Sequence, residues 1–192
     1  MCLDFSINPD KLLKFMNQHN SNNDDDVIIP MIDHIEKFIE KPNSVFDNMP
    51  ICPFVNKFRQ ENKILYKVYN FYYSEKLGLD AKVIDLINEF KKDEYHEVMI
   101  VIHSDKQALS LEEMKQFTTN LNNLISPLDL IAFSGHPLDD FNIDGVYTRQ
   151  DPFINFTVQN IQAINMYAQK LKSTGYYERW TLENLNYINH VI

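Results

Sequence analysis

Residues 128–158 read LDLIAFSGHPLDDFNIDGVYTRQDPFINFTV, and this stretch decides how the rest of the chain is arranged. An apolar run at 130–133 and an alternating run at 153–158, each preceded by a proline, predict two β-strands. The long connection between them carries His136, several aspartates and Arg149. Because a compact domain seldom keeps so long a loop without a use, we expect the functional site in this loop.

Upstream, the sequence predicts two further strands alternating with helices. The first strand alternates in polarity, and the second, EVMIVIH, is a nearly continuous apolar run typical of a strand covered on both faces. Apolar residues at helical spacing predict a helix after each strand, the second opened by a capping box of Ser110 and Glu113. The expected elements are a strand at 63–72, a helix at 79–90, a strand at 97–103 and a helix at 111–125.

A further helix is expected at 161–171, and Thr181 is expected to cap a last one. Because crossover connections are right-handed, the first three strands should run parallel in one sheet, and the strand at 153–158 should join them antiparallel. We therefore predict an α/β layered domain with a mixed sheet of about four strands in the order β-α-β-α-β-β-α. A thioredoxin-like arrangement is one candidate topology.

The N-terminal region predicts helices outside that order. Residues 9–18 and 28–39 carry apolar residues at helical spacing, and the polar stretch HNSNNDDD at 19–26 predicts a surface loop between them. We expect residues 1–41 to form an N-terminal helical extension and residues 42–192 to form the α/β domain.

Composition excludes several classes of protein. A chain of 192 residues buries about two-thirds of its unfolded surface and needs no disulfides for a core. The formal net charge of -9 disfavours nucleic-acid and anionic-membrane partners. Cys2 and Cys52 cannot make a disulfide framework, and no apolar run reaches the length of a signal sequence or membrane span. We expect a cytoplasmic protein with a small-molecule partner.

Cys52 lies between Pro50 and Pro53, which hold the backbone extended. A cysteine before a proline can present a thiolate to a haem iron or another metal, or act as a nucleophile if its pKa is lowered. Simple burial of a lone cysteine is the alternative. The chain has no C-x-x-C motif, so thioredoxin-type exchange is not expected.

His103 and His136 fall at the ends of the second and third predicted strands, where open α/β sheets bind ligands. Together with Cys52 they form a candidate nitrogen and sulfur metal set, although their spacing follows no zinc motif. Arg149 is suited to clamp a carboxylate, propionate or phosphate, or else to pair with Asp151 at the surface.

Four segments carry a resemblance. Their order and approximate spacing resemble small bacterial families of uncharacterised function, whose members share a CPF motif, a strand ending in F-H-P and an R-S-P segment before the last strand. The layout is more distantly similar to the YqcI/YcgG family, which includes haem-dependent N-hydroxylases of arginine-like guanidino groups. This chain departs by Gly135 inserted before His136 and by Gln150 and Asp151 in place of serine. The segments are ICPF at 51–54, EVMIVIHS at 97–104, FSGHP at 133–137 and YTRQDPF at 147–153.

The resemblance implies haem held by these segments and carries over Cys52, His136 and Arg149. With it, we expect Cys52 or His136 as axial ligand and Arg149, or Arg59 outside the segments, on a propionate. We therefore expect a haem-binding protein. The activity that this suggests is that of an oxidoreductase, a haem-dependent oxygenase or N-hydroxylase of a small nitrogenous substrate. Two alternatives stay open. One is an enzyme with Cys52 as nucleophile and His136 or His103 as base, or a Cys/His metal enzyme. The other is a non-catalytic module that binds a small ligand or a peptide.

These readings share one structural requirement. Segment 51–54 and the loop at 135–152 must meet in one pocket, although they are far apart in the chain. We expect the side chains of Cys52 and His136 within about 12 Å of each other, which is the scale of a ligand-sized pocket.

Overall fold

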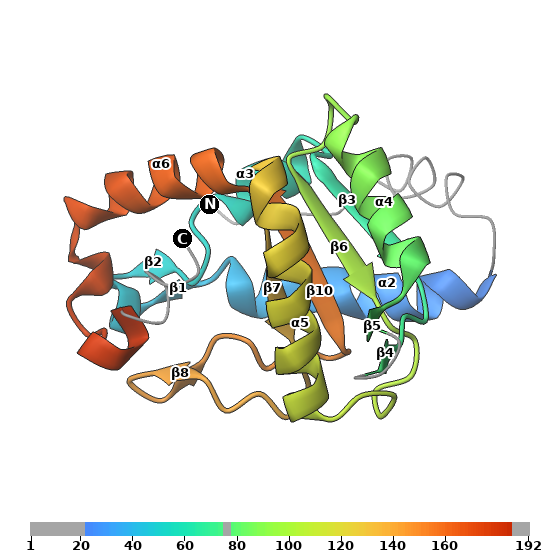
Figure 1. Ribbon diagram of the computed structural model, residues 1–192. Helices are drawn as coiled ribbons and strands as arrows, with labels where there is room; N and C mark the ends of the chain where they lie inside the picture. The colour runs from blue at the N-terminus through green and yellow to red at the C-terminus, as the bar shows by residue number, and fades with distance from the viewer. Residues whose placement is uncertain (1–21, 75–77, 186–192) are drawn as a thin grey trace.

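The computed structural model describes residues 22–74 and 78–185 (Figure 1). A four-stranded sheet in the order β3-β6-β10-β7 forms its centre. β3 pairs parallel with β6, and β10 pairs antiparallel with both β6 and β7. The sheet is mixed and helices pack on it, so the predicted α/β class is confirmed. The strands are β3 Ile64–Val68, β6 Val98–Ile102, β7 Leu130–Gly135 and β10 Asn155–Asn160.

The last strand enters the interior of the sheet. β10 separates β6 from β7, so Phe156 lies opposite Val101 on one side and Ser134 on the other. The first strand, β3, is left at an edge. A thioredoxin-like sheet places the first strand of this order in its interior, so the arrangement formed here is a different one. β3 also ends at Val68, before the predicted limit of residue 72.

One face of the sheet is covered by α4 (Ala81–Lys91) and α5 (Leu111–Ile125), which lie in front of it in Figure 1. The predicted capping box opens α5, with Ser110 Oγ accepting from the Glu113 N–H at 3.3 Å. Apolar side chains of both helices and of alternate strand residues form the main core on this α4–α5 face. The fully buried side chains there include Ile87, Phe117, Leu121, Phe156 and Val158.

The opposite face is covered in part by α2 (Asn22–His34) and the π-helix η1 (Ile35–Ile39). Val27, Ile28 and Met31 pack against β3 and β6 on this α2 face. The expectation of a loop through residue 26 is wrong, because α2 begins at Asn22. Acidic residues in the first turn favour that start through the helix dipole. The predicted helix at 9–18 lies outside the described residues, and the boundary at residue 41 stays a prediction.

A smaller cluster beside the sheet combines the chain beyond β10 with residues 45–51 and 141–146. α6 (Ile161–Lys172) leaves β10 and runs away from the sheet (Figure 1), and η4 (Gly175–Tyr177) follows it. Phe46, Ile143 and Tyr176 are buried in this satellite cluster. The remaining elements are β1 Pro42–Asn43, η2 Ser44–Phe46, β2 Met49–Pro50, α3 Val55–Gln60, β4 Tyr73–Ser74, β5 Gly78–Leu79, η3 Ser126–Leu128, β8 Asn142–Ile143 and β9 Val146–Tyr147.

Across residues 22–74 and 78–185, no helix combines the length and apolar character needed to cross a membrane.

Candidate functional site

A cavity of about 340 Å³ lies on the α2 face of the sheet. α2 and η1 cover β3 and β6 but leave part of β10 and β7 open, and α6 with the satellite cluster closes the space from the other side. Segment 51–55 and residues 148–151 of the long loop also line it. Its volume is at the small end of the range for small-molecule pockets.

The floor of the cavity is polar. β10 turns Phe156 and Val158 toward the main core, whereas Asn155, Thr157 and Gln159 line the cavity. A strand inside a sheet that helices cover is ordinarily apolar on both faces. Within the part of the chain that the structure describes, the side chains of Thr157 and Gln159 have no hydrogen-bond partner, so their polar groups are open to a ligand or to water.

A second polar feature joins β10 to the loop before it. Asn155 Nδ2 donates to Asp151 Oδ2 at 2.8 Å, and Asp151 Oδ1 lies 3.2 Å from Nε2 of His34 on α2. A Cβ added at Gly135 would lie 1.8 Å from Asp151 Oδ2. Gly135 therefore leaves the space that the carboxylate occupies, and any side chain there would displace Asp151 or the strand. Gly135 is also the residue by which the chain departs from the F-H-P motif.

Cys52 lines the cavity, and its N–H donates to the carbonyl of Ile39 at the end of η1 at 3.3 Å. Burial raises the pKa of the Cys52 thiol, and this effect outweighs the hydrogen bonds from the Phe54 and Val55 backbone that lower it. The thiol is therefore protonated at neutral pH. Because the thiolate is the reactive form, the raised pKa disfavours a nucleophilic role for Cys52.

Aromatic side chains make much of the wall. The rings of Phe54 and Tyr167 stack with centroids 4.1 Å apart, and Phe58 meets Tyr167 at 5.9 Å. On the satellite side, Trp180 packs against Tyr177 with a centroid distance of 5.2 Å. Trp180 is the one tryptophan of the sequence, so its fluorescence reports on this cavity alone.

Arg59 does not line the cavity. Its guanidinium binds Glu40 in a bidentate pair, at 2.7 Å from Nε and 2.9 Å from Nη2, and Nη1 lies 2.6 Å from Glu36 Oε1. The hydrogen bond to Glu40 is the main reason why the pKa of Arg59 is raised. Arg59 thus ties α3 to the π-helix η1, and its charge is used there rather than on a propionate. π-Helical turns are frequent at functional sites, and Ile35 and Ile39 of η1 both line the cavity.

His136 is also directed away from the cavity. It is 2% exposed, its Nδ1 accepts the N–H of Leu138 at 3.0 Å, and its Nε2 lies 3.1 Å from the carbonyl oxygen of Leu109. Since Nδ1 accepts, Nε2 carries the proton and donates to Leu109. Both ring nitrogens hydrogen-bond to backbone groups, so His136 anchors its loop to the segment before α5. Neither nitrogen is placed to bind iron or to accept a proton from a substrate.

His103 has a similar local role. Its Nδ1 accepts the N–H of Asp105 at 3.0 Å, and its ring meets the edge of Phe71. Burial lowers the pKa of His103. It does not line the cavity, and among the described residues no group of three or more His, Cys, Asp or Glu is arranged to hold a metal ion. The structure therefore does not assemble Cys52, His103 and His136 into a metal set.

Of the residues expected at the site, Cys52 and Arg149 do meet in the cavity. The Arg149 guanidinium lies 4.0 Å from the ring centroid of Phe141. Sequence reasoning missed the polar floor and Trp180. One signal was available, because the alternation in INFTVQN, residues 154–160, places three polar residues on one face of a strand next to the proposed site.

Comparison of the chain with protein-family models, with curated proteins and with solved structures found no match. The resemblance to the CPF families and to haem-dependent N-hydroxylases stays a prediction, and the cavity itself carries what can be inferred about function.

Proposed function

We propose that this protein binds a small organic molecule with an apolar body and a polar end in the cavity on the α2 face. The observation that carries this proposal is the floor of β10, an interior strand that presents Asn155, Thr157 and Gln159 to a space with aromatic walls. Thr157 and Gln159 are half-buried there, so their polar groups are within reach of water or of a ligand that enters the cavity. A few polar groups in a largely apolar pocket are the usual way in which proteins orient a small ligand.

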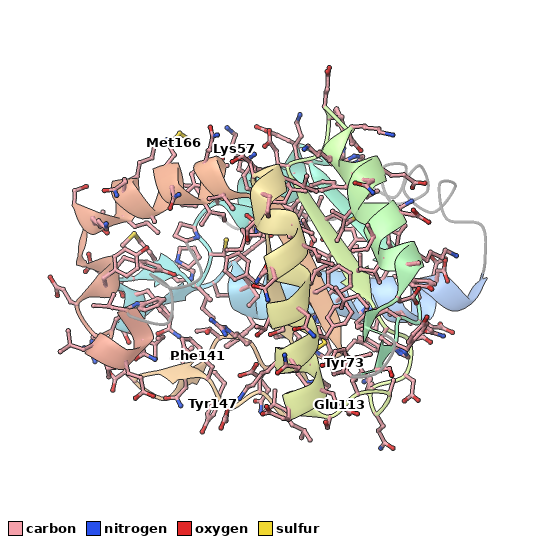
Figure 2. All side chains as sticks on the ribbon, viewed as in Figure 1. Lys57, Tyr73, Glu113, Phe141, Tyr147 and Met166 are labelled. Carbon is pink, nitrogen blue, oxygen red and sulfur yellow. The ribbon has the colours of Figure 1, made fainter. Side chains whose placement is uncertain are left out.

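The test uses phenylbutanol, a neutral molecule with an aromatic body and a hydroxyl end, titrated while Trp180 fluorescence and binding heat are recorded. Saturable binding at one site is expected, with a Kd of about 1 mM or below for a ligand of this size. Ala168→Phe fills the cavity from α6 and should abolish binding. Met166→Phe is the matched control, because Met166 is 47% exposed on the outer side of the same helix (Figure 2).

The proposal fails if phenylbutanol does not saturate, or if Ala168→Phe binds it as well as Met166→Phe does. Circular dichroism of both variants separates loss of binding from loss of fold.

Haem is a second candidate ligand, favoured by the surroundings of Cys52. Two residues expected to hold haem, Cys52 and Arg149, line the cavity, and the Phe54 and Val55 backbone hydrogen-bonds to the Cys52 side chain. Such hydrogen bonds support a thiolate ligand of a metal. Cys52 would ligate the iron and Arg149 would pair with a propionate, whereas His136 and Arg59 do not fit these roles. Haem would supply oxygen and electron-transfer chemistry.

Adding haem to the purified protein and recording the Soret band tests this second candidate. A shifted band is expected in the native chain and in His136→Ala, but not in Cys52→Ala. A band that is the same with and without the thiol would exclude Cys52 as the iron ligand.

A further inference from the structure

The charged side chains at the cavity are few. Among the residues that line it, Asp151 and Arg149 carry a formal charge. The Arg149 guanidinium lies on the ring of Phe141, which belongs to the satellite cluster. Asp151 lies instead beside the polar floor, where Asn155 binds it. The two charges therefore offer two different anchors for a ligand, and their surroundings decide between them.

Asp151 is held in place but is not saturated. Oδ2 accepts one hydrogen bond from Asn155, and Oδ1 faces His34 Nε2 at 3.2 Å. A carboxylate has about four lone-pair sites, so it can accept further hydrogen bonds. The Asp151 side chain keeps 19% of its surface exposed and lines the cavity. The carboxylate is thus bound by Asn155, lies beside His34 and occupies the space that Gly135 leaves, and it still lines the cavity.

The walls of the cavity that holds this carboxylate favour positive charge. Phe54, Tyr167 and Trp180 line the same cavity, and an open aromatic face attracts cations through the negative part of its quadrupole. An apolar wall also lowers the local dielectric, so the attraction between a carboxylate and a cation is stronger there than in water. The formal charge of -9 on the chain adds a long-range attraction of the same sign.

We propose that Asp151 is the anchor of the cavity and that its ligand is an organic cation, an ammonium group on an aromatic or apolar body. This inference rests on the proposed function and goes further by naming the charge of the ligand and the residue that reads it. Thr157 and Gln159 hydrogen-bond to other polar atoms of the ligand. Gly135 and His34 act as positioning residues, because they lie against the carboxylate and do not line the cavity, whereas Asn155 both holds the carboxylate and lines the cavity.

The experiment compares three probes with one body and different ends, namely phenylbutylamine, phenylbutanol and phenylbutyrate. At pH 8 the amine is cationic and the acid anionic, and an ordinary histidine is neutral. Trp180 fluorescence and calorimetry report binding. The amine should bind at least about tenfold more tightly than the alcohol, which corresponds to 1.4 kcal/mol, and the butyrate should bind more weakly than the alcohol.

Asp151→Asn should reduce the ratio of amine to alcohol affinity to near one, while the alcohol affinity changes little. Asp140→Asn is the matched control. Asp140 belongs to the same loop, its side chain is 80% exposed, and it pairs with Lys115 outside the cavity. Gly135→Ala is a second variant that keeps the carboxylate but displaces it, and it should lower the same ratio.

The outcomes separate the two proposals. If all three probes bind equally, the cavity binds small molecules but Asp151 does not select a cation, and the inference falls alone. If the butyrate binds best, Arg149 is the anchor and the inference is overturned. If no probe binds, the proposed function falls and this inference with it.

Discussion

The two faces of β10 differ although they belong to one six-residue strand. On the α4–α5 face, Phe156 and Val158 are fully buried among helix side chains. On the α2 face, Thr157 and Gln159 line a cavity that neither α2 nor α6 fills. The helices α4 and α5 lie flat on the sheet, whereas α6 runs away from it (Figure 1). Along β10, one face therefore serves stability and the other leaves room for a ligand.

The difference teaches how the same backbone alternation can serve two purposes. The apolar half of the alternation drives folding, since each buried side chain leaves water. The polar half contributes little to folding, so its residues can be chosen for a ligand. Substitutions on the two faces should have separable effects on stability and on binding.

The largest expected effect is that of Phe156→Ala. Its ring is 0% exposed in the main core, and a truncated aromatic side chain there costs about 3–5 kcal/mol. Thr157→Val, one residue along and on the other face, should change the free energy of unfolding by less than about 1 kcal/mol. Urea denaturation of both variants measures the difference, and equal losses would remove the contrast between the faces.

Gly135→Ala should come next. The new Cβ would lie 1.8 Å from Asp151 Oδ2 and 2.4 Å from Asn155 Nδ2, so one of them must move. We expect a loss of about 1–3 kcal/mol, as for overpacking of a tight site. Thermal denaturation measures it, with Ser134→Ala as a neighbouring control. A loss below about 0.5 kcal/mol would mean that the Asp151 carboxylate does not rest on β7.

The reactivity of Cys52 tests the cavity face of the sheet. Because burial raises the pKa of its thiol, the alkylation rate with iodoacetamide should reach half its maximum at a higher pH in the folded protein than in the same protein unfolded in urea. The measurement uses a Cys2→Ser background. A midpoint equal to or below the unfolded one would restore the nucleophile hypothesis. A ligand in the cavity should slow alkylation further.

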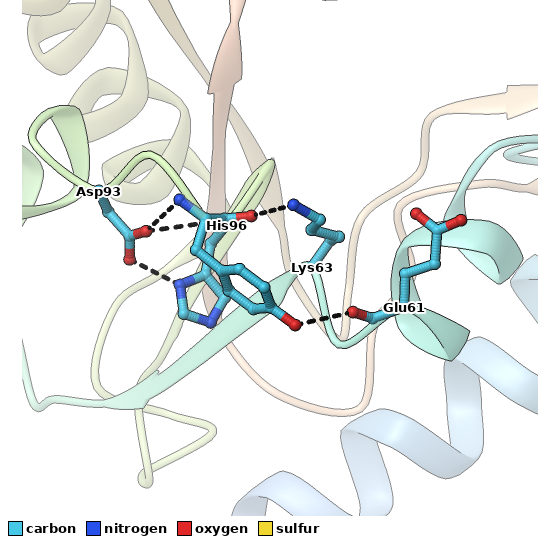
Figure 3. Close-up of polar contacts among 5 residues, drawn as sticks. Glu61, Lys63, Asp93 and His96 are labelled. Carbon is cyan, nitrogen blue, oxygen red and sulfur yellow. Dashed lines mark hydrogen bonds and ion pairs between the residues drawn. The ribbon is translucent and has the colours of Figure 1, made fainter.

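The smallest effect is expected at the turn between α4 and β6 (Figure 3), because no residue of 92–97 lines the cavity. Asp93 accepts from the N–H groups of Tyr95 and His96 and lies 2.6 Å from His96 Nδ1. The Tyr95 carbonyl accepts a hydrogen bond from Lys63 Nζ, and the Tyr95 hydroxyl donates to the Glu61 carbonyl. These bonds fix the α4–β6 turn to the start of β3.

Burial raises the pKa of Asp93, but the hydrogen bonds from His96 and Tyr95 lower it more, so the net shift is downward. A lowered folded pKa stabilises the protein above the unfolded pKa, near 3.9 for Asp, and this contribution is lost as the pH falls through the folded value. Asp93→Asn should cost at most about 1 kcal/mol at neutral pH and less below about pH 4.

Denaturation of Asp93→Asn across pH measures this, with Asp85→Asn, exposed on α4, as control. Probe binding in the cavity should not change in either variant. A stability difference that does not shrink at low pH would show that the carboxylate charge is not what stabilises the turn.

The sequence alone determined the elements and their class. Alternation and helical spacing located β6, α4, α5 and α6 within a few residues, since these patterns reflect which side chains leave water. The order of elements then predicted three strands in one direction and one reversed. The sequence also pointed to segment 51–54 and the loop before β10, which do meet in one cavity.

Only the tertiary structure decided which residues face that cavity. His136 and Arg59 look equally suited to a site in the sequence. In the structure, His136 hydrogen-bonds to the Leu109 carbonyl, and Arg59 pairs with Glu36 and Glu40. Because β10 lies inside the sheet and not at its edge, Thr157 and Gln159 form the floor of a pocket and not part of the outer surface. Pairing partners and strand order depend on contacts between residues far apart in the chain, and local periodicity contains no record of them.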